Sequence, residues 1–409
     1  MARIAYITSR YPAISHTFVL REVAALRARG IEVDTFSVRA TDPAQLLSEA
    51  DRAEAASTTV IVPARPAELA GAHRRALARP AAYAGALRRA LDHGAGGPKS
   101  SLWRLFYLAE AGVLLDHCRE RGIRHVHAHF ANVGADVAML ASAMSGGEVG
   151  WSYTMHGPTE FADVAHFRLA EKTEEAGFVV CISDYCRSQL MKLVGPEHWD
   201  KLEIVHCGID PARFAPPAVP RRPGPLRVLC VGRLVPDKGQ ALLVDAMRLL
   251  AERSLDAELI LVGDGPDRAR LAESVARSGL GGRVTLAGAI GQDRVRDFYA
   301  DADVFCLPSF AEGVPVVLME AMAMGLPVVT TNITGVPELV EDGVSGHLVR
   351  PARPDQLADA VAGLAADPSL RRRMGEAGRR KVIEEFSTDV VGDRLAAVLA
   401  ARGALEPAA

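Results

Sequence analysis

The chain has 409 residues, of which 49% are hydrophobic, and its formal net charge is −3 at pH 7. Because this length exceeds what one hydrophobic core usually organises, the sequence predicts two domains. The near-neutral charge argues against a nucleic-acid-binding protein, whose binding domain would be strongly basic, and it favours no other partner class.

Apolar runs alternate with helical patterns along most of the chain, which predicts parallel sheets covered by helices. The strands predicted for a first sheet are 4–8, 33–38, 125–129, 150–155, 178–182 and 203–205. Those predicted for a second sheet are 226–231, 258–262, 283–287, 304–307 and 327–330. The sequence therefore predicts an α/β protein with two parallel-sheet domains.

The segment between the two sets of strands, residues 211–225, contains six prolines and no apolar period, which is typical of an interdomain linker. We therefore expect one domain at 1–218 and a second at 219–386. A C-terminal segment, 387–409, follows the second domain and contains an amphipathic helical pattern at about 388–401.

The N-terminus enters a strand directly, without a basic region followed by a long apolar segment, so no signal peptide or membrane span is predicted. The cysteines form no C-x-x-C pair and mostly lie in or beside apolar strands. We therefore expect reduced, buried thiols and a cytoplasmic protein. These cysteines are Cys118, Cys181, Cys186, Cys207, Cys230 and Cys306.

Residues 65–104 form a helical, alanine-rich and basic segment with very few acidic residues. One interpretation is contact with an anionic membrane surface, since clustered basic residues on an amphipathic helix attract acidic head groups. The alternative is a solvated helical face of the first domain. The basic residues concerned are Arg74, Arg75, Arg79, Arg88, Arg89, Lys99 and Arg104.

Histidines occupy alternate positions of the predicted strand 125–129, and another follows strand 150–155. We expect only two of His125, His127 and His129 to share a face, and no metal site, because zinc would need further ligands at suitable spacing. These three could instead line an acceptor site. His156 precedes Gly157-Pro158 at the carboxyl end of its strand, where open α/β sheets bind ligands.

The most informative stretch runs from Pro308 to Ala323 and carries two carboxylates separated by seven residues. It follows an apolar strand, so Glu312 is expected in the turn and Glu320 in a helix that opens with Pro315 at its first position. A carboxylate inside this helix can accept two hydrogen bonds from a ribose diol.

The same helix start would leave the backbone N–H groups of Gly313 and Val314 unpaired beside a partial positive charge, which suits a diphosphate. Asp301 and Asp303 have the D-x-D spacing of a cation site, but they precede their strand and are therefore expected at its amino end. We interpret them as capping or turn residues and predict no dependence on magnesium. Gly263-Asp264-Gly265 alone is weak evidence for a dinucleotide site.

Other motifs accompany this stretch in a fixed order: Thr154-Met155-His156-Gly157, Val231-Gly232-Arg233-Leu234 with Lys238-Gly239, Leu261-Val262-Gly263-Asp264-Gly265-Pro266, and Gly335-Val336-Pro337-Glu338. Together with the E-x7-E spacing, they resemble the retaining family 4 glycosyltransferases. The pattern Tyr11-Pro12-x-x-Ser15-x-Thr17-Phe18 resembles the exopolysaccharide, colanic-acid-type branch. The resemblance implies the GT-B fold, in which two Rossmann-like parallel-sheet domains face a deep interdomain cleft, and a C-terminal helix that returns to the first domain.

The resemblance also implies roles for individual residues. Arg233 and Lys238 would hold the diphosphate, Glu320 the ribose and Glu312 the hydroxyls of the transferred sugar. His156 would face the same cleft and contact the donor sugar or the diphosphate side, and His156, Glu312, Arg233 and Lys238 form the expected catalytic set. Further residues expected to bind the nucleotide-sugar are Gly232, Gly263, Gly265, Gly313, Val314 and Pro315.

The acceptor side departs from the family pattern. Many members have a Gly-Gly pair in the first strand–helix loop, where this chain has Ser9-Arg10-Tyr11-Pro12-Ala13-Ile14-Ser15-His16. Arg10, Ser15 and His16 are candidate acceptor contacts, and each could equally be a helix-capping or surface residue.

The resemblance implies a metal-independent, retaining hexosyltransferase that needs no cofactor. It would move a hexose from a nucleotide-diphosphate sugar to a hydroxyl of a glycan or lipid-linked acceptor in exopolysaccharide or surface-glycan biosynthesis. The location would be cytoplasmic, and at the inner face of the membrane if residues 65–104 bind lipid. Three alternatives stay open: a small natural-product acceptor, a non-catalytic sugar-nucleotide-binding scaffold, and a hydrolysing sugar-nucleotide epimerase.

Overall fold

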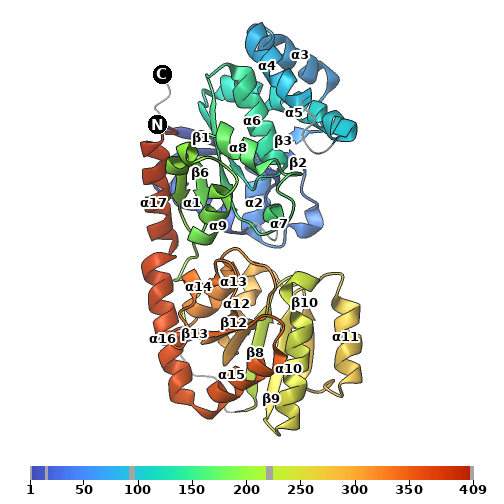
Figure 1. Ribbon diagram of the computed structural model, residues 1–409, viewed down its shortest axis with the longest axis vertical. Helices are drawn as coiled ribbons and strands as arrows, with labels where there is room; N and C mark the ends of the chain where they lie inside the picture. The colour runs from blue at the N-terminus through green and yellow to red at the C-terminus, as the bar shows by residue number, and fades with distance from the viewer. Residues whose placement is uncertain (1, 14–16, 92–96, 218–223, 406–409) are drawn as a thin grey trace. The chain divides into compact units, whose positions relative to one another are not determined.

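The computed structural model describes residues 2–13, 17–91, 97–217 and 224–405 (Figure 1). It divides into two compact units. The first unit runs through His206 and includes the segment from Val391 onward, and the second unit comprises Cys207–Val390. The expected boundary at 218/219 lies among residues outside the described ranges, and the units separate earlier, between His206 and Cys207.

The first unit contains a seven-stranded sheet in the order β3-β2-β1-β4-β5-β6-β7, and every pair in it is parallel. Its strands are β1 (Arg3–Arg10), β2 (Glu32–Arg39), β3 (Thr59–Val62), β4 (His125–His129), β5 (Gly150–Met155), β6 (Val179–Cys181) and β7 (Leu202–Ile204). The edge strand β3 was not predicted. Because the strand order reverses between β1 and β4, the carboxyl ends of these two strands form the switch point at which such sheets bind ligands.

Helices cover both faces of this sheet. They are α1 (Thr17–Ala28), α2 (Glu49–Ser57), α3 (Pro66–Ala76), α4 (Pro80–Leu91), α5 (Gly97–Arg121), α6 (Val133–Ser145), α7 (Thr159–Ala162), α8 (Leu169–Glu175), α9 (Asp184–Met191) and α17 (Thr388–Ala401). Successive side chains of β1 enter different cores, because strand residues alternate between faces. Ala5 and Ile7 join the core beneath α5 and α6, whereas Ile4 and Tyr6 join a core that includes Leu395 of α17.

The second unit contains a six-stranded parallel sheet in the order β10-β9-β8-β11-β12-β13. Its strands are β8 (Leu226–Val231), β9 (Ala257–Val262), β10 (Val284–Gly288), β11 (Val304–Leu307), β12 (Val328–Thr331) and β13 (Gly346–Val349). Its helices are α10 (Gln240–Glu252), α11 (Arg268–Arg277), α12 (Gln292–Ala300), α13 (Val316–Ala323), α14 (Val336–Leu339), α15 (Pro354–Ala366) and α16 (Pro368–Glu385). Here the order reverses between β8 and β11, so the loops after these strands form the second switch point.

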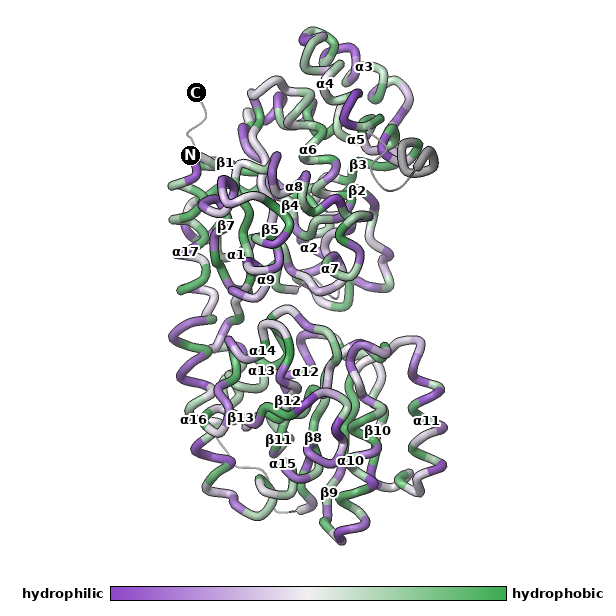
Figure 2. The backbone as a smooth tube through the Cα atoms, in the orientation of Figure 1, coloured by the Kyte–Doolittle hydropathy of each residue, from purple (hydrophilic) through white to green (hydrophobic). Residues whose placement is uncertain are grey.

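The hydropathy of the residues agrees with this arrangement of sheets covered by helices. In Figure 2 the strand β12 is green, whereas α16 is largely purple. All six cysteines are buried and none forms a disulfide bond, as predicted. In the described part of the chain, no helix combines the length and the apolar character that crossing a membrane requires.

Candidate active site

Glu312 is the centre of a hydrogen-bonded group in the second unit. It lies in the loop after β11, only 6% exposed, and its Oε1 atom accepts from Lys238 Nζ at 2.6 Å and from Ser309 Oγ at 2.6 Å. The hydroxyl of Thr334 donates to the backbone carbonyl of Glu312 at 2.6 Å. A buried carboxylate requires such partners. The structure thus joins two residues for which the family resemblance implies separate roles: Lys238 fixes Glu312 in place.

Glycines allow the loops after β8, β9 and β11 to meet. Gly239 has φ +64°, and a Cβ atom there would lie 2.2 Å from the carbonyl oxygen of Pro308. Gly263 has φ +141°, and its Cβ would lie 1.9 Å from the carbonyl oxygen of Gly232. Only glycine permits approaches this close in this region of φ. The backbone of these loops is therefore packed directly against itself at the carboxyl edge of the sheet.

The loop before α13 offers donors for an anion. Pro315 is the N-cap of α13 rather than its first residue, so the helix begins one residue later than predicted. Among the described residues, the backbone N–H groups of Gly313 and Val314 find no acceptor. They lie at the positive end of the helix, where phosphate oxygens bind favourably.

Glu320 lies inside α13, as predicted, and is 2% exposed. Its Oε2 atom accepts a hydrogen bond from the Tyr299 hydroxyl at 3.0 Å. The sequence offered no signal for this tyrosine, which comes from α12. Because Tyr299 is fully buried, it holds the Glu320 carboxylate in one orientation.

Arg233 follows β8 and is exposed. The side chain of Gln240 donates to the backbone carbonyl of Arg233 at 2.9 Å, which fixes the loop that carries it. Within the described ranges, its guanidinium forms no ion pair. Arg233 and Lys238 both lie between β8 and α10, and their side chains are suitable cations for a diphosphate, because the planar guanidinium can bind two oxygens at once.

Asp301 and Asp303 lie just before β11, at the amino end of the strand. Asp301 pairs with the Arg227 side chain, and Asp303 accepts from the Arg227 backbone N–H at 2.9 Å. These contacts are structural and are far along the strand from the loop that contains Glu312. The structure therefore places the D-x-D pair at the edge of the sheet opposite the candidate site.

His156 is the candidate residue of the first unit. It follows β5 directly, is 6% exposed, and its ring lies 4.6 Å from the rings of both Phe18 and Phe130. Its Nε2 atom is 3.0 Å from His129 Nδ1. His156 is thus held by a histidine on the neighbouring strand, a partner that the sequence did not indicate.

The histidines of β4 correct a prediction. His125, His127 and His129 all lie on one face, because every second residue of a strand points the same way. Their rings form a buried row with hydroxyls of β5. His125 Nε2 and His127 Nδ1 each lie 2.7 Å from Ser152 Oγ, and His127 Nε2 lies 2.8 Å from Thr154 Oγ1. Burial lowers the pKa of His125 to about 4, and burial and the adjacent histidines hold the pKa of His127 well below its usual range.

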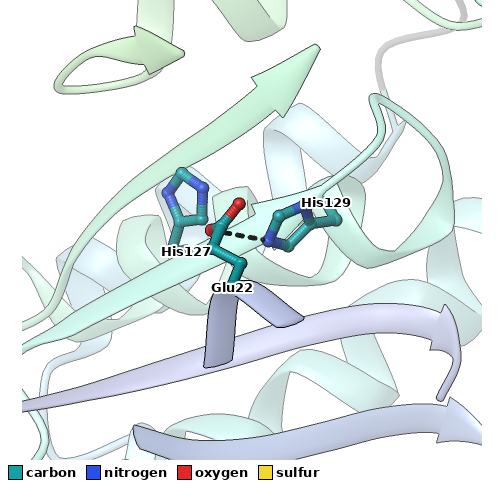
Figure 3. A group of neighbouring side chains, drawn as sticks. All are labelled: Glu22, His127 and His129. Carbon is teal, nitrogen blue, oxygen red and sulfur yellow. Dashed lines mark ion pairs between the residues drawn. The ribbon is translucent and has the colours of Figure 1, made fainter. Parts of the chain in front are cut away.

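Glu22 joins this row from α1, and Figure 3 shows its carboxylate between His127 and His129. The ligand atoms of these three residues lie within 4.8 Å of one another, so the group has the composition of a metal site. However, both ring nitrogens of His127 are already in hydrogen bonds with hydroxyls. Glu22 could not be predicted as part of this group, because only the packing of α1 brings it to β4.

The predicted acceptor residues are only partly described. Arg10 is the last residue of β1 and is exposed at the carboxyl end of the sheet. Ser15 and His16 lie outside the described residues.

The basic segment 65–104 differs from the predicted cationic patch. Ion pairs join Arg75 to Asp116, Arg79 to Glu148 and Arg89 to Glu175, and the side chain of Lys99 lies outside the described part. Arg104 is buried at 6% exposure. Much of the positive charge is therefore compensated.

The exposed feature of this segment is apolar. Leu102, Trp103 and Phe106 of α5 are 56%, 50% and 52% exposed, and the two aromatic rings lie 5.8 Å apart. Clustered large apolar side chains on a surface indicate an interaction site.

Comparison with known proteins agrees with this geometry. Residues 15–213 match the profile described as Glycosyltransferase Family 4, and residues 213–381 match the profile described as Glycosyl transferases group 1. The solved structure of Anabaena HepE in complex with UDP superposes with a TM-score of 0.74 at 18% identity, covering 98% of this chain and 100% of that chain. At this identity the match concerns the fold, and with the two parallel sheets it defines the GT-B class.

Two curated relatives narrow this class to a family. A GDP-mannose-dependent α-(1-6)-phosphatidylinositol monomannoside mannosyltransferase of Mycolicibacterium smegmatis is 33% identical, covering 66% of this chain and 72% of the relative. The amylovoran biosynthesis glycosyltransferase AmsK of Erwinia amylovora is 28% identical, covering 97% of this chain and 99% of the relative. The chain belongs to the family 4 glycosyltransferases. The end-to-end match with AmsK confirms the predicted resemblance to the exopolysaccharide branch.

Proposed function

We propose that this protein is a retaining, metal-independent hexosyltransferase. It moves a hexose from a nucleotide-diphosphate sugar to a hydroxyl of a glycan or lipid-linked acceptor in the synthesis of an exopolysaccharide or another surface glycan. The observation that carries the proposal is the group formed by Glu312, Lys238 and Ser309 at the switch point of the second unit. It lies beside two open backbone donors, those of Gly313 and Val314.

Breaking the bond between sugar and diphosphate leaves negative charge on the departing phosphate, and stabilising that charge is the main catalytic demand. Lys238, Arg233 and the two backbone N–H groups supply the positive charge and the donors. Glu320 binds the ribose hydroxyls, and Glu312, oriented by Lys238, binds hydroxyls of the transferred sugar. The donor is a substrate, and the reaction requires no cofactor.

Retention follows from attack on the same face of the sugar. The acceptor oxygen bonds to the anomeric carbon as the bond to the phosphate oxygen breaks, and the acceptor's proton passes to that phosphate oxygen. His156 contacts the donor sugar, and Glu312 offsets the positive charge that develops at the anomeric centre. The Glu312 carboxylate therefore has a different role from the two carboxylates of a glycosidase, which flank the scissile bond.

Donor binding tests this assignment. Thermal-shift and calorimetric titrations with UDP-, GDP-, ADP- and dTDP-sugars in EDTA should show tight binding of one donor. Arg233→Ala should abolish the response, and Arg248→Ala, which removes an exposed arginine from α10, should preserve it. No response to any nucleotide-sugar would exclude the proposed function, and a requirement for a divalent cation would exclude its metal-independent form.

The stereochemistry needs a separate measurement. Proton NMR of the first product formed should show the anomeric configuration of the donor. An inverted product would rule out attack on the same face, and release of free sugar without an acceptor would favour a hydrolase.

We also propose that the first unit contacts the membrane through Leu102, Trp103 and Phe106. Tryptophan, phenylalanine and leucine are the residues that amphipathic surface helices insert at the boundary between head groups and acyl chains. Arg74 and Arg88 are exposed on the neighbouring helices and would attract anionic head groups. Such contact would place a cytoplasmic enzyme at the inner face of the membrane, where a lipid-linked acceptor is available.

A further inference from the structure

Glu22, His129 and His156 form a continuous line of polar groups within the first unit. His129 Nε2 lies 3.3 Å from Glu22 Oε1, and His129 Nδ1 lies 3.0 Å from His156 Nε2. Both histidines are buried, and the Glu22 side chain is 13% exposed. The line runs from α1 through the end of β4 to the residue after β5, so three separate elements contribute to it.

The hydrogen-bonding capacity of each group determines where the protons lie. A carboxylate only accepts, and a neutral imidazole has one N–H and one lone pair. Glu22 Oε1 already accepts from the Tyr6 hydroxyl at 2.7 Å, and burial together with the Glu22 charge raises the pKa of Tyr6 well above its usual range, so Tyr6 remains a donor. Next to this carboxylate, the proton of His129 is most stable on Nε2.

One proton position then fixes the next. With its proton on Nε2, His129 has a lone pair on Nδ1, which can only accept from His156. The proton of His156 must therefore lie on its own Nε2, and Nδ1 carries the lone pair. The rings of Phe18 and Phe130, each 4.6 Å from that of His156, restrict rotation that would exchange the two nitrogens.

We propose that Glu22 and His129 are positioning residues that hold His156 as the neutral Nε2–H tautomer, with Nδ1 as an acceptor for a hydroxyl of the bound sugar. This inference rests on the proposed role of His156 at the donor. It adds to that role a direction: His156 accepts a hydrogen bond from the substrate and does not donate one. The logic is that of a carboxylate that orients a catalytic histidine through the opposite ring nitrogen.

A metal at Glu22, His127 and His129 is the competing use of the same atoms. His129 Nε2 is buried without a well-aligned hydrogen bond among the described residues, so its lone pair could in principle bind a cation. Yet His127 would have to give up the hydrogen bond that each of its nitrogens makes with Ser152 or Thr154. The line from Glu22 to His156 leaves both hydrogen bonds of His127 in place.

The tautomers can be measured directly. The full chain, labelled with ¹⁵N at histidine and dialysed against EDTA, would be studied by long-range ¹H–¹⁵N correlation spectra, with His129→Gln and His156→Gln for assignment. We expect neutral Nε2–H rings at both positions. An Nδ1–H tautomer at either position, or an imidazolium at His156, would overturn the proposal.

Kinetics add a readout that loss of stability alone would not produce. Glu22→Gln removes the charge beside His129, and we expect kcat to fall about 10-fold with the KM for the donor unchanged. In a His156→Ala background the same substitution should have no further effect, because both act through one residue. Additive losses of kcat in Glu22→Gln/His156→Ala would show that Glu22 does not act through His156, and would contradict the proposal.

Glu54→Gln is the matched control, since Glu54 is a buried carboxylate of the same unit that pairs with Arg27 at 2.6 Å and with no histidine that the structure describes. In Glu54→Gln, the tautomers of His129 and His156 and the value of kcat should equal those of the wild type, whether or not the substitution lowers stability. A matching fall in kcat would show that any lost buried carboxylate has this effect, and would refute the specific role of Glu22.

The NMR measurement needs no substrate, so the two proposals can fail separately. A chain that binds no nucleotide-sugar but shows both Nε2–H rings would refute the proposed function and leave the proton positions established. An active transferase with other tautomers would refute the inference alone. One equivalent of zinc that co-purifies with the wild type and is lost in Glu22→Gln would also refute it, and would assign Glu22, His127 and His129 to a metal.

Discussion

Replacing Lys238 should destabilise the second unit and abolish transfer, and these two effects should be separable. Among the described residues, Lys238→Met leaves the Glu312 carboxylate, 6% exposed, with only the Ser309 hydroxyl as a side-chain donor. Removing one partner from a fully buried ion pair costs about 3–5 kcal/mol. Because the Lys238 side chain is 27% exposed, solvent screens the remaining charge, and we expect about 2 kcal/mol.

For a unit of this size, about 2 kcal/mol corresponds to a lowering of its thermal midpoint by about 4–8 °C. Adding Glu312→Gln removes the unpaired charge, so the double variant should recover most of the midpoint. Its activity should stay about 10²–10³-fold below wild type, because the ammonium that stabilises the leaving diphosphate is still missing.

The experiment is a double-mutant cycle. Calorimetry and initial transfer rates would be measured for the wild type, Lys238→Met, Glu312→Gln and the double variant. An unchanged thermal midpoint in Lys238→Met would show that the ion pair between Lys238 and Glu312 contributes no stability. Recovery of activity in the double variant would show that transfer needs neither the ammonium nor the carboxylate, and would refute the role of Lys238 at the diphosphate and that of Glu312 at the sugar.

Three further changes test other parts of the structure. Gly239→Ala should lower the second unit's stability and weaken donor binding, because a Cβ there would lie 2.2 Å from a backbone oxygen at φ +64°; unchanged calorimetry and binding would contradict this. Burial raises the pKa of Glu110 to about 7, against the opposing charge of Arg39. A raised carboxyl pKa makes stability fall as the pH rises through that value, so Glu110→Gln should match the wild type at pH 5 and exceed it at pH 8 in urea unfolding. The double variant Trp103→Ser/Phe106→Ser should lose co-sedimentation with vesicles containing phosphatidylglycerol while keeping donor affinity; retained co-sedimentation would exclude this patch as the membrane contact.

The elements that lie in the middle of the sheets were the ones the sequence predicted best. Buried parallel strands such as β8 and β11 are nearly continuous apolar runs, which stand out from their polar surroundings. The edge strands β3 and β13 were missed although they are as long as β11; they are only partly buried, whereas β11 is buried throughout. The alternation rule, applied correctly to β4, would have placed its three histidines on one face.

Side-chain partners could not be predicted in the same way. Lys238 and Glu312 are 74 residues apart, and only the adjacency of β8 and β11 brings their loops together. Glu22 reaches His129 from α1, at a position that belongs to none of the motifs recognised in the sequence. The arginines of segment 65–104 looked uncompensated because their acidic partners, such as Asp116, lie outside the segment. Sequence spacing describes one strand or helix at a time, whereas these contacts depend on which elements become neighbours.

The first unit is discontinuous along the chain, and this affects the order in which the protein can fold during synthesis. Leu395 and Leu399 of α17 belong to the same core as Ile4 of β1 and Val23 of α1. The ribosome makes the entire second unit before it makes these residues. Until then the nascent first unit exposes an apolar face to solvent, whereas all residues of the second unit have already been made. A chain that stops before Thr388 would keep that face uncovered and be a target for chaperones and proteases.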